Sequence, residues 1–270
     1  MKTIVITGAS SGIGKATAKH FAEQGWQVAA TMRNSENETE LTQIDNIKLY
    51  QLDVTDAASI NHAVAQILND FEIVNVVLNN AGYAVAGPFE ATTPEQIRRQ
   101  FETNVFGLME VTRAFLPHFR ANKAGLFLNV SSIGGRVTFP FISLYHSTKW
   151  AVEGYTESLA YELGELGIQV KLIEPGGVAT DFGGRSMDMA MPNNLPDYVP
   201  SVQKFRAARE NSPLGASTAE SIGAGIYNAA TDGKNQLRYL LGDDAVQIYG
   251  IHQQVGDDAF AAGIRQRMLS

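Results

Sequence analysis

The sequence predicts an α/β protein with a doubly wound fold in three layers, built on a central, mostly parallel sheet of about seven strands. Short β-branched runs alternate with longer amphipathic stretches along the whole chain. These runs are almost continuously hydrophobic, as expected of strands that are buried on both faces. The 270 residues are 44% hydrophobic, and no linker, repeat or low-complexity tract divides them. We therefore expect one domain over residues 1–270.

The expected strands follow one another at regular intervals, at residues 3–7, 28–32, 47–52, 74–79, 126–130, 169–174 and 237–241. A helix over residues 15–24 is expected after the first strand. "TPEQ" at 93–96 combines a Thr N-cap, Pro at the first helical position and Gln at the third, and "STAE" at 217–220 is expected to form a capping box. This order of elements is typical of a Rossmann-type sheet, whose ligands bind at the carboxyl ends of the strands.

Composition excludes several classes of function. The absence of cysteine excludes disulfides, thiolate metal sites and a cysteine nucleophile, and the five histidines lack close ligand spacing, so no metal is expected. The net charge of −7 argues against nucleic-acid or anionic membrane partners. No signal-like N-terminus and no apolar run of about 18 residues is present, which favours a soluble, cytoplasmic protein.

A glycine-rich turn, "TGASSGIG" at 7–14, follows the first strand and opens the next helix. Glycine suits such a turn where φ is positive and where the backbone approaches a ligand, and the helix N-terminus offers N–H groups to a pyrophosphate. An ordinary strand-to-helix turn is the alternative interpretation. The expected cofactor-binding residues here are Gly8, Ser10, Ser11, Gly12, Ile13 and Gly14.

The second strand ends in "TMRN", which places Arg33 where an NAD enzyme of this architecture presents an acid to the adenosine ribose. The nearest acid is Glu36. Because a guanidinium pairs bidentately with a phosphate, Arg33 favours NADP(H) over NAD(H). The alternative is a solvated surface arginine.

Further motifs follow later strands in a fixed order: "LDV" (52–54), "NNAG" (79–82), "NVFG" (104–107), "NVSS" (129–132), "YHSTK" (145–149) and "PGGVAT" (175–180). Together with the glycine turn they resemble the compact branch of the short-chain dehydrogenase/reductase family, from residue 3 to about 180 and again near the last strand. The resemblance implies a catalytic tetrad of Asn104, Ser132, Tyr145 and Lys149. It also implies cofactor contacts from Asp53, Val54, Asn80, Ala81, Gly82, Tyr145, Lys149, Pro175, Gly176, Val178 and Thr180. Members of the family are commonly homodimers or homotetramers.

The chemistry of hydride transfer agrees with these roles. Tyr145 and Lys149 would lie one turn apart on one helix face. An alkoxide left by hydride transfer needs a proton, and a tyrosine with a pKa near 10 must fall by roughly 3 units, about 4 kcal/mol, to act near pH 7. One cation about 4 Å away supplies about that much at an effective dielectric constant near 20. Ser132 would donate to the substrate oxygen, whereas His146 is expected to be structural or part of the pocket wall.

Single residues of this set also have plainer interpretations. Asn104 is equally consistent with a buried polar group bonded to backbone, Ser132 with a turn residue and Thr180 with a helix N-cap. Their occurrence together in register favours the catalytic interpretation.

Residues 181–213 form a long irregular stretch, which we expect to be a substrate-binding loop or lid. An apolar pocket for a hydrophobic alcohol or ketone is expected from Tyr83, Phe139, Phe141, Phe182, Met187, Met189, Met191 and Tyr198, unless these are core or subunit contacts. Arg136 and Arg185 are candidates for binding a charged substrate. Residues 242–270 form a C-terminal extension that is expected to pack on the domain or on a neighbouring subunit.

The sequence therefore predicts an NADP(H)-dependent oxidoreductase that interconverts a secondary alcohol and a ketone, or an alcohol and an aldehyde, with Tyr145 as general acid/base. In other words, it predicts a carbonyl reductase. A non-catalytic NADP(H)-binding redox sensor is the main alternative. A sugar-nucleotide epimerase or dehydratase is disfavoured by the TGxxxGxG spacing and the modest length.

Overall fold

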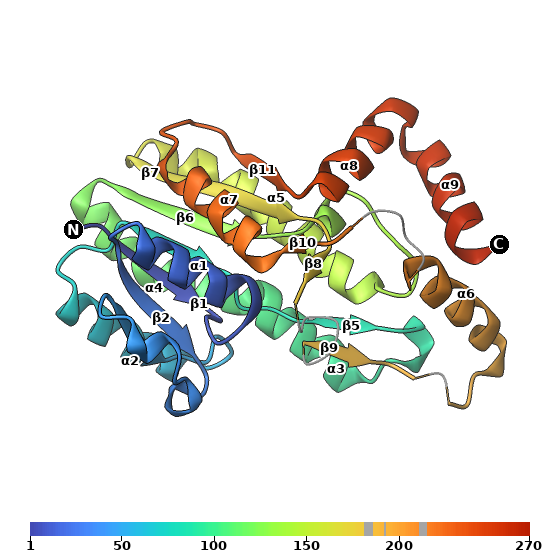
Figure 1. Cartoon of the computed structure of the whole chain (residues 1–270), viewed down its shortest axis with the longest axis horizontal. Coiled ribbons are helices and arrows are strands. Elements are labelled where there is room, and N and C mark those ends of the chain that lie inside the picture. Colours follow the sequence, from blue (N-terminus) through green and yellow to red (C-terminus); the bar gives the residue numbers. More distant parts are fainter. Residues whose placement is uncertain (181–185, 192, 211–214) are drawn as a thin grey trace.

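The computed structural model describes residues 1–180, 186–191, 193–210 and 215–270. Within these residues a seven-stranded, wholly parallel sheet forms the centre of the molecule, in the order β11-β7-β6-β4-β1-β2-β3 (Figure 1). Its strands are β1 (Thr3–Thr7), β2 (Gln27–Met32), β3 (Ile47–Gln51), β4 (Val76–Asn79), β6 (Gly125–Val130), β7 (Ile168–Pro175) and β11 (Arg238–Leu241). The doubly wound fold and the seven predicted strands are confirmed, with ends that differ by at most two residues.

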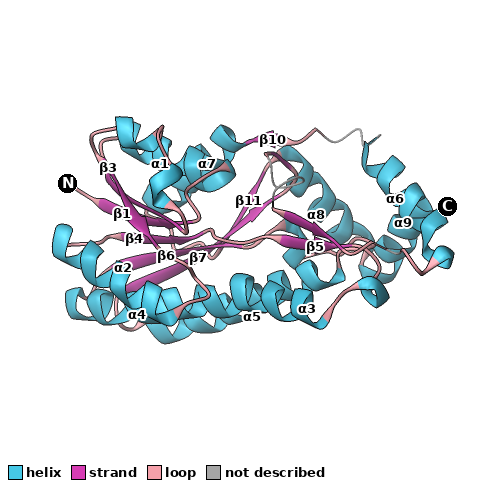
Figure 2. Ribbon diagram, turned by 90° about the horizontal axis from the view of Figure 1, so that it is seen from below, coloured by secondary structure: helices cyan, strands magenta, loops and turns pink. Residues whose placement is uncertain are grey.

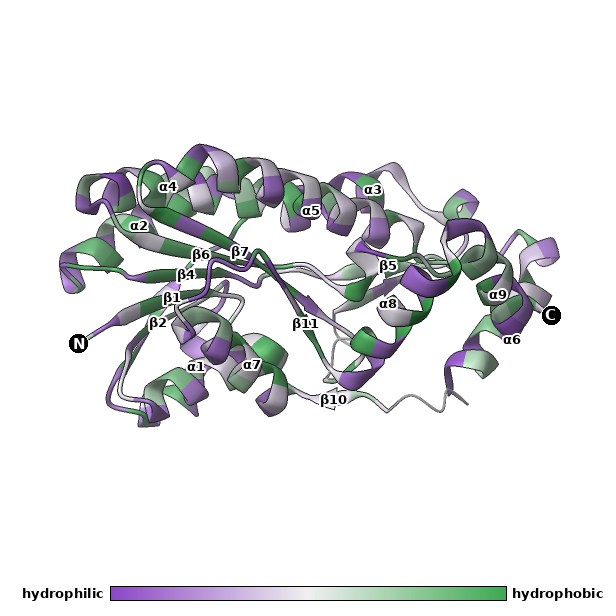
Figure 3. Ribbon diagram, turned by 90° about the horizontal axis from the view of Figure 1, so that it is seen from above, coloured by the Kyte–Doolittle hydropathy of each residue, from purple (hydrophilic) through white to green (hydrophobic). Residues whose placement is uncertain are grey.

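Helices cover both faces of the sheet (Figure 2). The helices are α1 (Gly12–Glu23), α2 (Ala57–Asp70), α3 (Pro94–Phe101), α4 (Gly107–Asn122), α5 (Ser143–Gly164), α6 (Val199–Glu210), α7 (Ala219–Thr231), α8 (Asp243–Val255) and α9 (Asp257–Leu269). α1 and α7 pack on one face, and α2, α4 and α5 pack on the other. Figure 3 shows that these helices carry both hydrophobic and hydrophilic residues, as expected of helices with one buried side.

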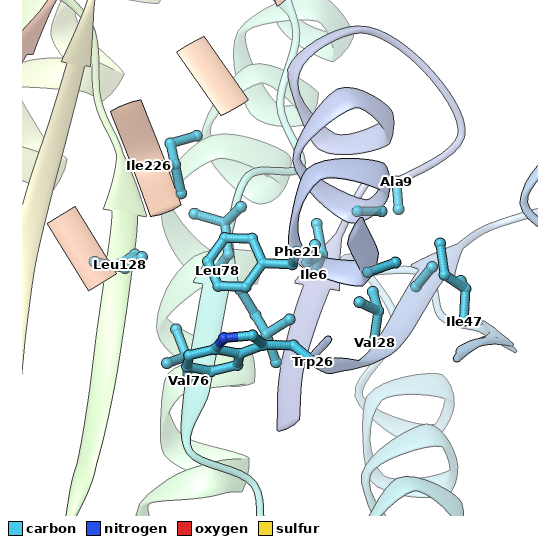
Figure 4. Packing of buried hydrophobic residues seen from close by; sticks show 14 of the residues in the cluster. Ile6, Ala9, Phe21, Trp26, Val28, Ile47, Val76, Leu78, Leu128 and Ile226 are labelled. Atoms are coloured by element: carbon cyan, nitrogen blue, oxygen red, sulfur yellow. The ribbon is translucent and has the colours of Figure 1, made fainter. Parts of the chain in front are cut away.

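Burial on both faces explains the continuous hydrophobic strands. Along β1, Ile4 and Ile6 belong to the core under α1 and α7, whereas Val5 belongs to the core under α2, α4 and α5. Successive side chains of a strand point to opposite faces, so each face needs its own apolar residues. In the first core, Phe21 and Trp26 meet edge to face, with ring centroids 5.1 Å apart (Figure 4).

Two helix starts were expected from capping signals, and one of them is wrong by a residue. Thr93 caps α3 with the full capping box, since its side chain and that of Gln96 bond to each other's backbone N–H. α7 is capped by Thr218, whose Oγ1 accepts from Ser221 N at 3.1 Å. Ser217 and Thr218 both lie in a short strand that pairs with Val178 and Ala179, and the second of them is the cap. α1 begins at Gly12, three residues earlier than expected.

Two short parallel ladders were not predicted from the sequence. β8 (Val178–Ala179) pairs with β10 (Ser217–Thr218), and β5 (Ala84–Ala86) pairs with β9 (Met187–Met189). β9 belongs to the expected lid. Its Asp188 accepts from Gln96 Nε2 at 3.0 Å and forms an ion pair with Arg99, so this part of the segment is fixed to α3.

The C-terminal helices lie beside α6 at one end of the molecule (Figure 1). Ala245 and Ile248 of α8 pack on Ile133 and Val137, which follow β6. Lys204 of α6 donates to the carbonyl of Leu269 at 3.3 Å. Among the described helices, none is long and apolar enough to cross a membrane.

Candidate active site

The glycine turn has a shape that only glycine adopts without strain. Gly8 and Gly12 have φ values of +69° and +54°. A Cβ atom on Gly14 would lie 2.4 Å from the Gly8 carbonyl oxygen and 2.5 Å from Asn80 Nδ2. The backbone of the turn is therefore folded tightly against the start of α1.

The "NNAG" segment lies directly beside this turn. Asn80 Nδ2 donates to the carbonyl oxygens of Thr7 and Gly8, at 2.9 and 3.1 Å. Thr7 Oγ1 in turn accepts from the backbone N–H groups of Asn80 and Ala81, at 3.0 and 3.1 Å. The structure thus brings the two motifs together at the carboxyl edge of the sheet, and Thr7 is the unpredicted residue that joins them.

Arg33 follows β2 at the same edge. The glycine turn is bonded to this strand through Ala9 N and Thr31 O, 3.0 Å apart. Arg33 is exposed and forms no ion pair with any described residue. By contrast, the nearby Lys15 of α1 is paired with Glu38 at 3.0 Å. Arg33 is therefore the basic side chain of this region that is free to meet a ligand.

"LDV" lies farther along this edge, where its acid stabilises a turn. Asp53 Oδ1 accepts from Thr55 N at 2.9 Å and from Thr55 Oγ1 at 2.8 Å, and Asp53 N donates to Ser59 Oγ at 3.0 Å. Asp53 and Val54 are both half-buried. The structure shows the shape of this turn, and the cofactor contacts of Asp53 and Val54 stay a prediction.

Asn104 lies in a π-helical turn, Glu102–Phe106, between α3 and α4. Such single turns interrupt a helix and are frequent at functional sites. Its buried amide accepts from Tyr83 N at 3.1 Å and donates to Tyr83 O at 2.9 Å and to Thr148 Oγ1 at 3.1 Å. Thr148 Oγ1 donates to Tyr145 O at 2.7 Å, so Asn104 braces the turn of α5 that begins at Tyr145.

Ser132 follows β6 and meets Tyr145. Its Oγ accepts from Gly134 N at 3.0 Å, approaches Pro175 O at 3.5 Å and is hydrogen-bonded to Tyr145. Burial raises the pKa of the Tyr145 phenol, and the hydrogen bond with Ser132 acts against that rise. Ser132 and Tyr145, thirteen positions apart in the sequence, form one contact.

Lys149 lies one turn after Tyr145, as the spacing predicted. Its Nζ donates to Val130 O at 2.8 Å and lies 5.5 Å from the centroid of the Tyr145 ring. Burial lowers the pKa of Lys149 to about 8, and the negative charge of Glu153 limits this lowering. A lowering of the Tyr145 pKa by Lys149 stays a prediction, because burial is the dominant influence on Tyr145 in this structure.

His146 occupies a structural position behind Tyr145. It is buried, its Nδ1 accepts from Phe139 N at 3.4 Å, and its ring centroid lies 6.1 Å from that of Tyr145. Burial lowers its pKa to about 4, so the ring is neutral at pH 7.

The "PGGVAT" segment faces the glycine turn and is held by an acid that the sequence did not reveal. A Cβ atom on Gly12 would lie 3.5 Å from Thr180 Cβ. From α8, Asp244 Oδ2 accepts from Gly177 N at 2.6 Å, and a Cβ atom on Gly176 would lie 2.2 Å from Asp244 Oδ1. An acidic residue at the start of a helix is common, and Asp244 is 67 positions away from Gly177, so no local signal marked it.

A cavity of about 440 Å³ adjoins the glycine turn. Residues of α1, β8, the segment after it and α7 line this cavity: Gly12, Lys15, Ala16, Lys19, His20, Glu23, Ala179, Thr180, Ala219 and Glu220. Of these lining residues, only Gly12 and Thr180 belong to the predicted cofactor site.

The expected apolar pocket residues are only partly gathered. Tyr83 packs with Val85 and Leu144, whereas Phe139 packs with Ile133 and Phe260 of α9. Phe141 instead meets Phe205 of α6, with ring centroids 5.6 Å apart. Of the others, Met187 and Tyr198 are half-buried and Met189 and Met191 are exposed, while Phe182 and Arg185 lie outside the described residues.

Arg136 is not available to a charged substrate. It pairs with the buried Glu174 at 3.2 Å and stacks on the Tyr249 ring at 4.3 Å. Among the described residues, no group of three or more potential ligands could hold a metal ion.

Comparison with known proteins identifies the class. A family model described as short chain dehydrogenase matches residues 2–190. An uncharacterised oxidoreductase of Schizosaccharomyces pombe is 39% identical over 88% of this chain and 99% of its own length. The 3-ketodihydrosphingosine reductase of Bacteroides thetaiotaomicron is 36% identical over 83% of this chain and 81% of its own length. The chain belongs to the short-chain dehydrogenase family of oxidoreductases.

Solved structures agree with this assignment. A short-chain dehydrogenase from Streptomyces avermitilis superimposes with a TM-score of 0.85 at 35% identity, over 98% of this chain and 95% of that one. ElxO with NADP bound gives 0.75 at 28% identity, over 91% and 99%. The 3-ketoacyl-(acyl-carrier-protein) reductase of Brucella melitensis, in complex with NADH, gives 0.76 at 26% identity, over 89% and 96%.

Proposed function

We propose that the protein is an NADP(H)-dependent oxidoreductase that interconverts a secondary alcohol and a ketone, or an alcohol and an aldehyde. The observation that carries this proposal is the contact between Ser132 and Tyr145, with Lys149 one helical turn away, at the edge of the sheet that also carries the glycine turn. A protein that only senses a dinucleotide has no need of this constellation.

The residues present fit a dinucleotide. Gly8 and Asn80 lie so close to Gly14 that no side chain fits at this position. No described side chain caps the N-terminus of α1, whereas Asp56, Thr93 and Thr218 cap α2, α3 and α7. Its N–H groups can therefore bind a pyrophosphate.

The exposed Arg33 supports NADP(H) as the preferred cofactor, because its guanidinium would pair with the 2′-phosphate. ElxO with NADP bound supports the same choice. The Brucella reductase is in complex with NADH, so NAD(H) is the alternative cofactor that the titration below tests.

When bound, the nicotinamide cofactor supplies or accepts the hydride. In reduction, Tyr145 donates a proton to the developing alkoxide while Ser132 donates a hydrogen bond to the same oxygen. Lys149 holds a positive charge beside the phenol and favours its ionised form. Asn104 keeps the first turn of α5 in place through its hydrogen bond to Thr148.

We further propose an apolar carbonyl substrate. Phe139, Phe141 and Tyr83 are half-buried aromatic residues, and Arg136 is already paired. The similarity to a 3-ketodihydrosphingosine reductase supports this class of substrate. In this proposal the chain is one domain over residues 1–270, residues 181–213 act as the substrate loop, and residues 242–270 close one side of the site.

A homodimer or homotetramer through α4 and α5 completes the proposal. Trp150 and Tyr161 of α5 are 52% and 75% exposed, which suits a subunit contact. Light scattering of the purified protein checks the assembly, and a monomer at micromolar concentration would contradict it.

The proposed function is tested by fluorescence titration of the purified protein with NADPH and NADH, followed by a panel of ketones and aldehydes monitored through loss of reduced-nicotinamide absorbance. Tighter binding of NADPH and turnover of an apolar carbonyl are expected. Binding without turnover on a broad panel would favour the redox sensor, and tighter binding of NADH would contradict the role of Arg33.

A further inference from the structure

Two buried acids and two half-buried arginines meet next to the turn of α5 that carries Lys149. Glu153 lies one turn after Lys149 on α5, and Glu174 lies near the end of β7. Glu153 is 5% exposed and Glu174 is fully buried. Arg136, from the loop after β6, and Arg238, the first residue of β11, approach the two acids.

The arginines occupy only one oxygen of each carboxyl group. Arg238 Nε lies 3.1 Å from Glu153 Oε2 and 3.4 Å from Glu174 Oε1. Arg136 Nη1 donates to Glu174 Oε1 at 3.2 Å. The two remaining oxygens, Glu153 Oε1 and Glu174 Oε2, are buried and accept no hydrogen bond from any described donor. Buried acceptors of this kind are costly when they stay unpaired.

A proton between the two carboxyl groups would give this site the donor that it lacks. Arg238 Nε lies within 3.4 Å of one oxygen of each acid, so the two groups are neighbours, and two ionised carboxylates cannot bond to each other because neither carries a donor. Burial and the neighbouring charge of Glu153 raise the pKa of Glu174 to about 7, against the effect of Arg136. Two acids in one buried site hold a proton in common for the same reason.

The other charged and titratable groups around this site are accounted for. Arg238 Nη2 also binds Glu157 at 2.6 Å on the exposed side of α5. Arg136 stacks on Tyr249 of α8. Lys149 is buried, and the negative charge of Glu153 favours its protonated form.

The acids also adjoin the loop that carries Ser132. A Cβ atom on Gly135 would lie 2.6 Å from Ser131 Oγ and 3.1 Å from Glu153 Oε1. Ser131 Oγ is a third buried oxygen that has no partner among the described residues. The acids therefore lie between the serine loop, the turn of α5 that carries Lys149 and the strand that leads into "PGGVAT".

We propose that Glu153 and Glu174 share one proton, and that Glu153 is a positioning residue that keeps the ammonium of Lys149 charged and its helical turn fixed against β7. The proposal rests on the proposed function, in which Lys149 assists Tyr145. It adds an acid pair, held by two arginines, as the support on which the charge of Lys149 depends.

The first test is the pH profile of turnover in Glu153→Gln. The amide still bonds to Glu174 and accepts from Arg238, but the negative charge of the pair then lies on Glu174 and no longer on Glu153, the acid that acts on Lys149. Removing that charge makes the Tyr145–Lys149 pair easier to deprotonate, so the alkaline limb of kcat for carbonyl reduction is expected to move about one unit to lower pH. The Kd of NADPH is expected to stay within about twofold, since the substitution leaves the cofactor-facing side of the site intact.

Glu157→Gln is the matched control. Glu157 also pairs with Arg238, but it lies one turn farther from Lys149 and its side chain is 43% exposed. The alkaline limb of kcat in this variant is expected to stay at the pH of the wild type. An unmoved limb in Glu153→Gln, or a loss of kcat that is uniform across pH, would overturn the positioning role.

The second test measures the shared proton without turnover. A carboxyl group whose pKa is raised on folding stabilises the folded protein while the group is protonated. This contribution is complete below the unfolded pKa near 4.5 and is lost as the pH rises to about 7. Gln at position 174 imitates the protonated acid at every pH. The Tm of Glu174→Gln minus that of the wild type is therefore expected to increase from pH 5 to pH 8.

The same difference is expected to stay flat for Glu157→Gln, because Arg238 holds the pKa of Glu157 below its usual value. If the Tm difference between Glu174→Gln and the wild type does not change with pH, the shared proton is refuted, even in an active enzyme. A rising difference in a protein that reduces no carbonyl would instead refute the proposed function and leave the acid pair standing.

Discussion

Removal of the Asp244 side chain is expected to loosen the "PGGVAT" segment and weaken cofactor binding. Asp244 is 8% exposed, and its Oδ2 accepts from Gly177 N at 2.6 Å. A hydrogen bond to a charged group contributes about 1.5–3 kcal/mol. Since about 1 kcal/mol corresponds to about 2–4 °C in a protein of this size, Asp244→Ala is expected to lower the Tm by about 3–12 °C.

The same variant is expected to raise the Kd of NADPH about tenfold, because about 1.4 kcal/mol of the lost bond would then have to be supplied on binding. Differential scanning fluorimetry and NADPH titration measure the two effects. Asp243→Ala is the control: Asp243 lies in the same helical turn but is exposed. Its loss removes only a helix-terminal charge, about 0.3–1 kcal/mol, and no cofactor affinity. Equal effects of the two substitutions on Tm and Kd would refute the assignment to Asp244.

Two further substitutions test the cofactor site by titration with both dinucleotides. Arg33→Ala is expected to raise the Kd of NADPH by about 10- to 100-fold and to leave that of NADH unchanged, because the guanidinium meets only the 2′-phosphate; an equal loss for both would contradict this role. Gly14→Ala is expected to abolish measurable binding, since its Cβ would lie 2.4 Å from the Gly8 carbonyl oxygen. Gly154→Ala, on α5, is the control that should bind normally, because no described atom beyond the helix's own nearby backbone lies within 4 Å of the new Cβ.

Much of the fold could be predicted because the decisive signals are local. Strands buried on both faces are continuously hydrophobic, and Ile4, Val5 and Ile6 divide between two cores as that pattern requires. The spacing of Tyr145 and Lys149 placed them on one face of a helix, and they lie so in α5.

The parts that could not be predicted depend on distant pairings. The π-helical turn of Asn104 is held by hydrogen bonds to Tyr83, 21 positions earlier. β9 of the expected lid pairs with β5, about a hundred positions away. The substrate pocket was the least predictable feature, since its expected residues divide between separate clusters.

The central claim is that the Tyr145 hydroxyl transfers the proton. The most direct measurement is kcat for carbonyl reduction by Tyr145→Phe, together with its Kd for NADPH. Turnover is expected to fall by about 10²- to 10⁴-fold, the usual contribution of a general acid, while Kd changes little, since the hydroxyl acts mainly in the transition state. Turnover comparable to that of the wild type, at unchanged NADPH affinity, would contradict it.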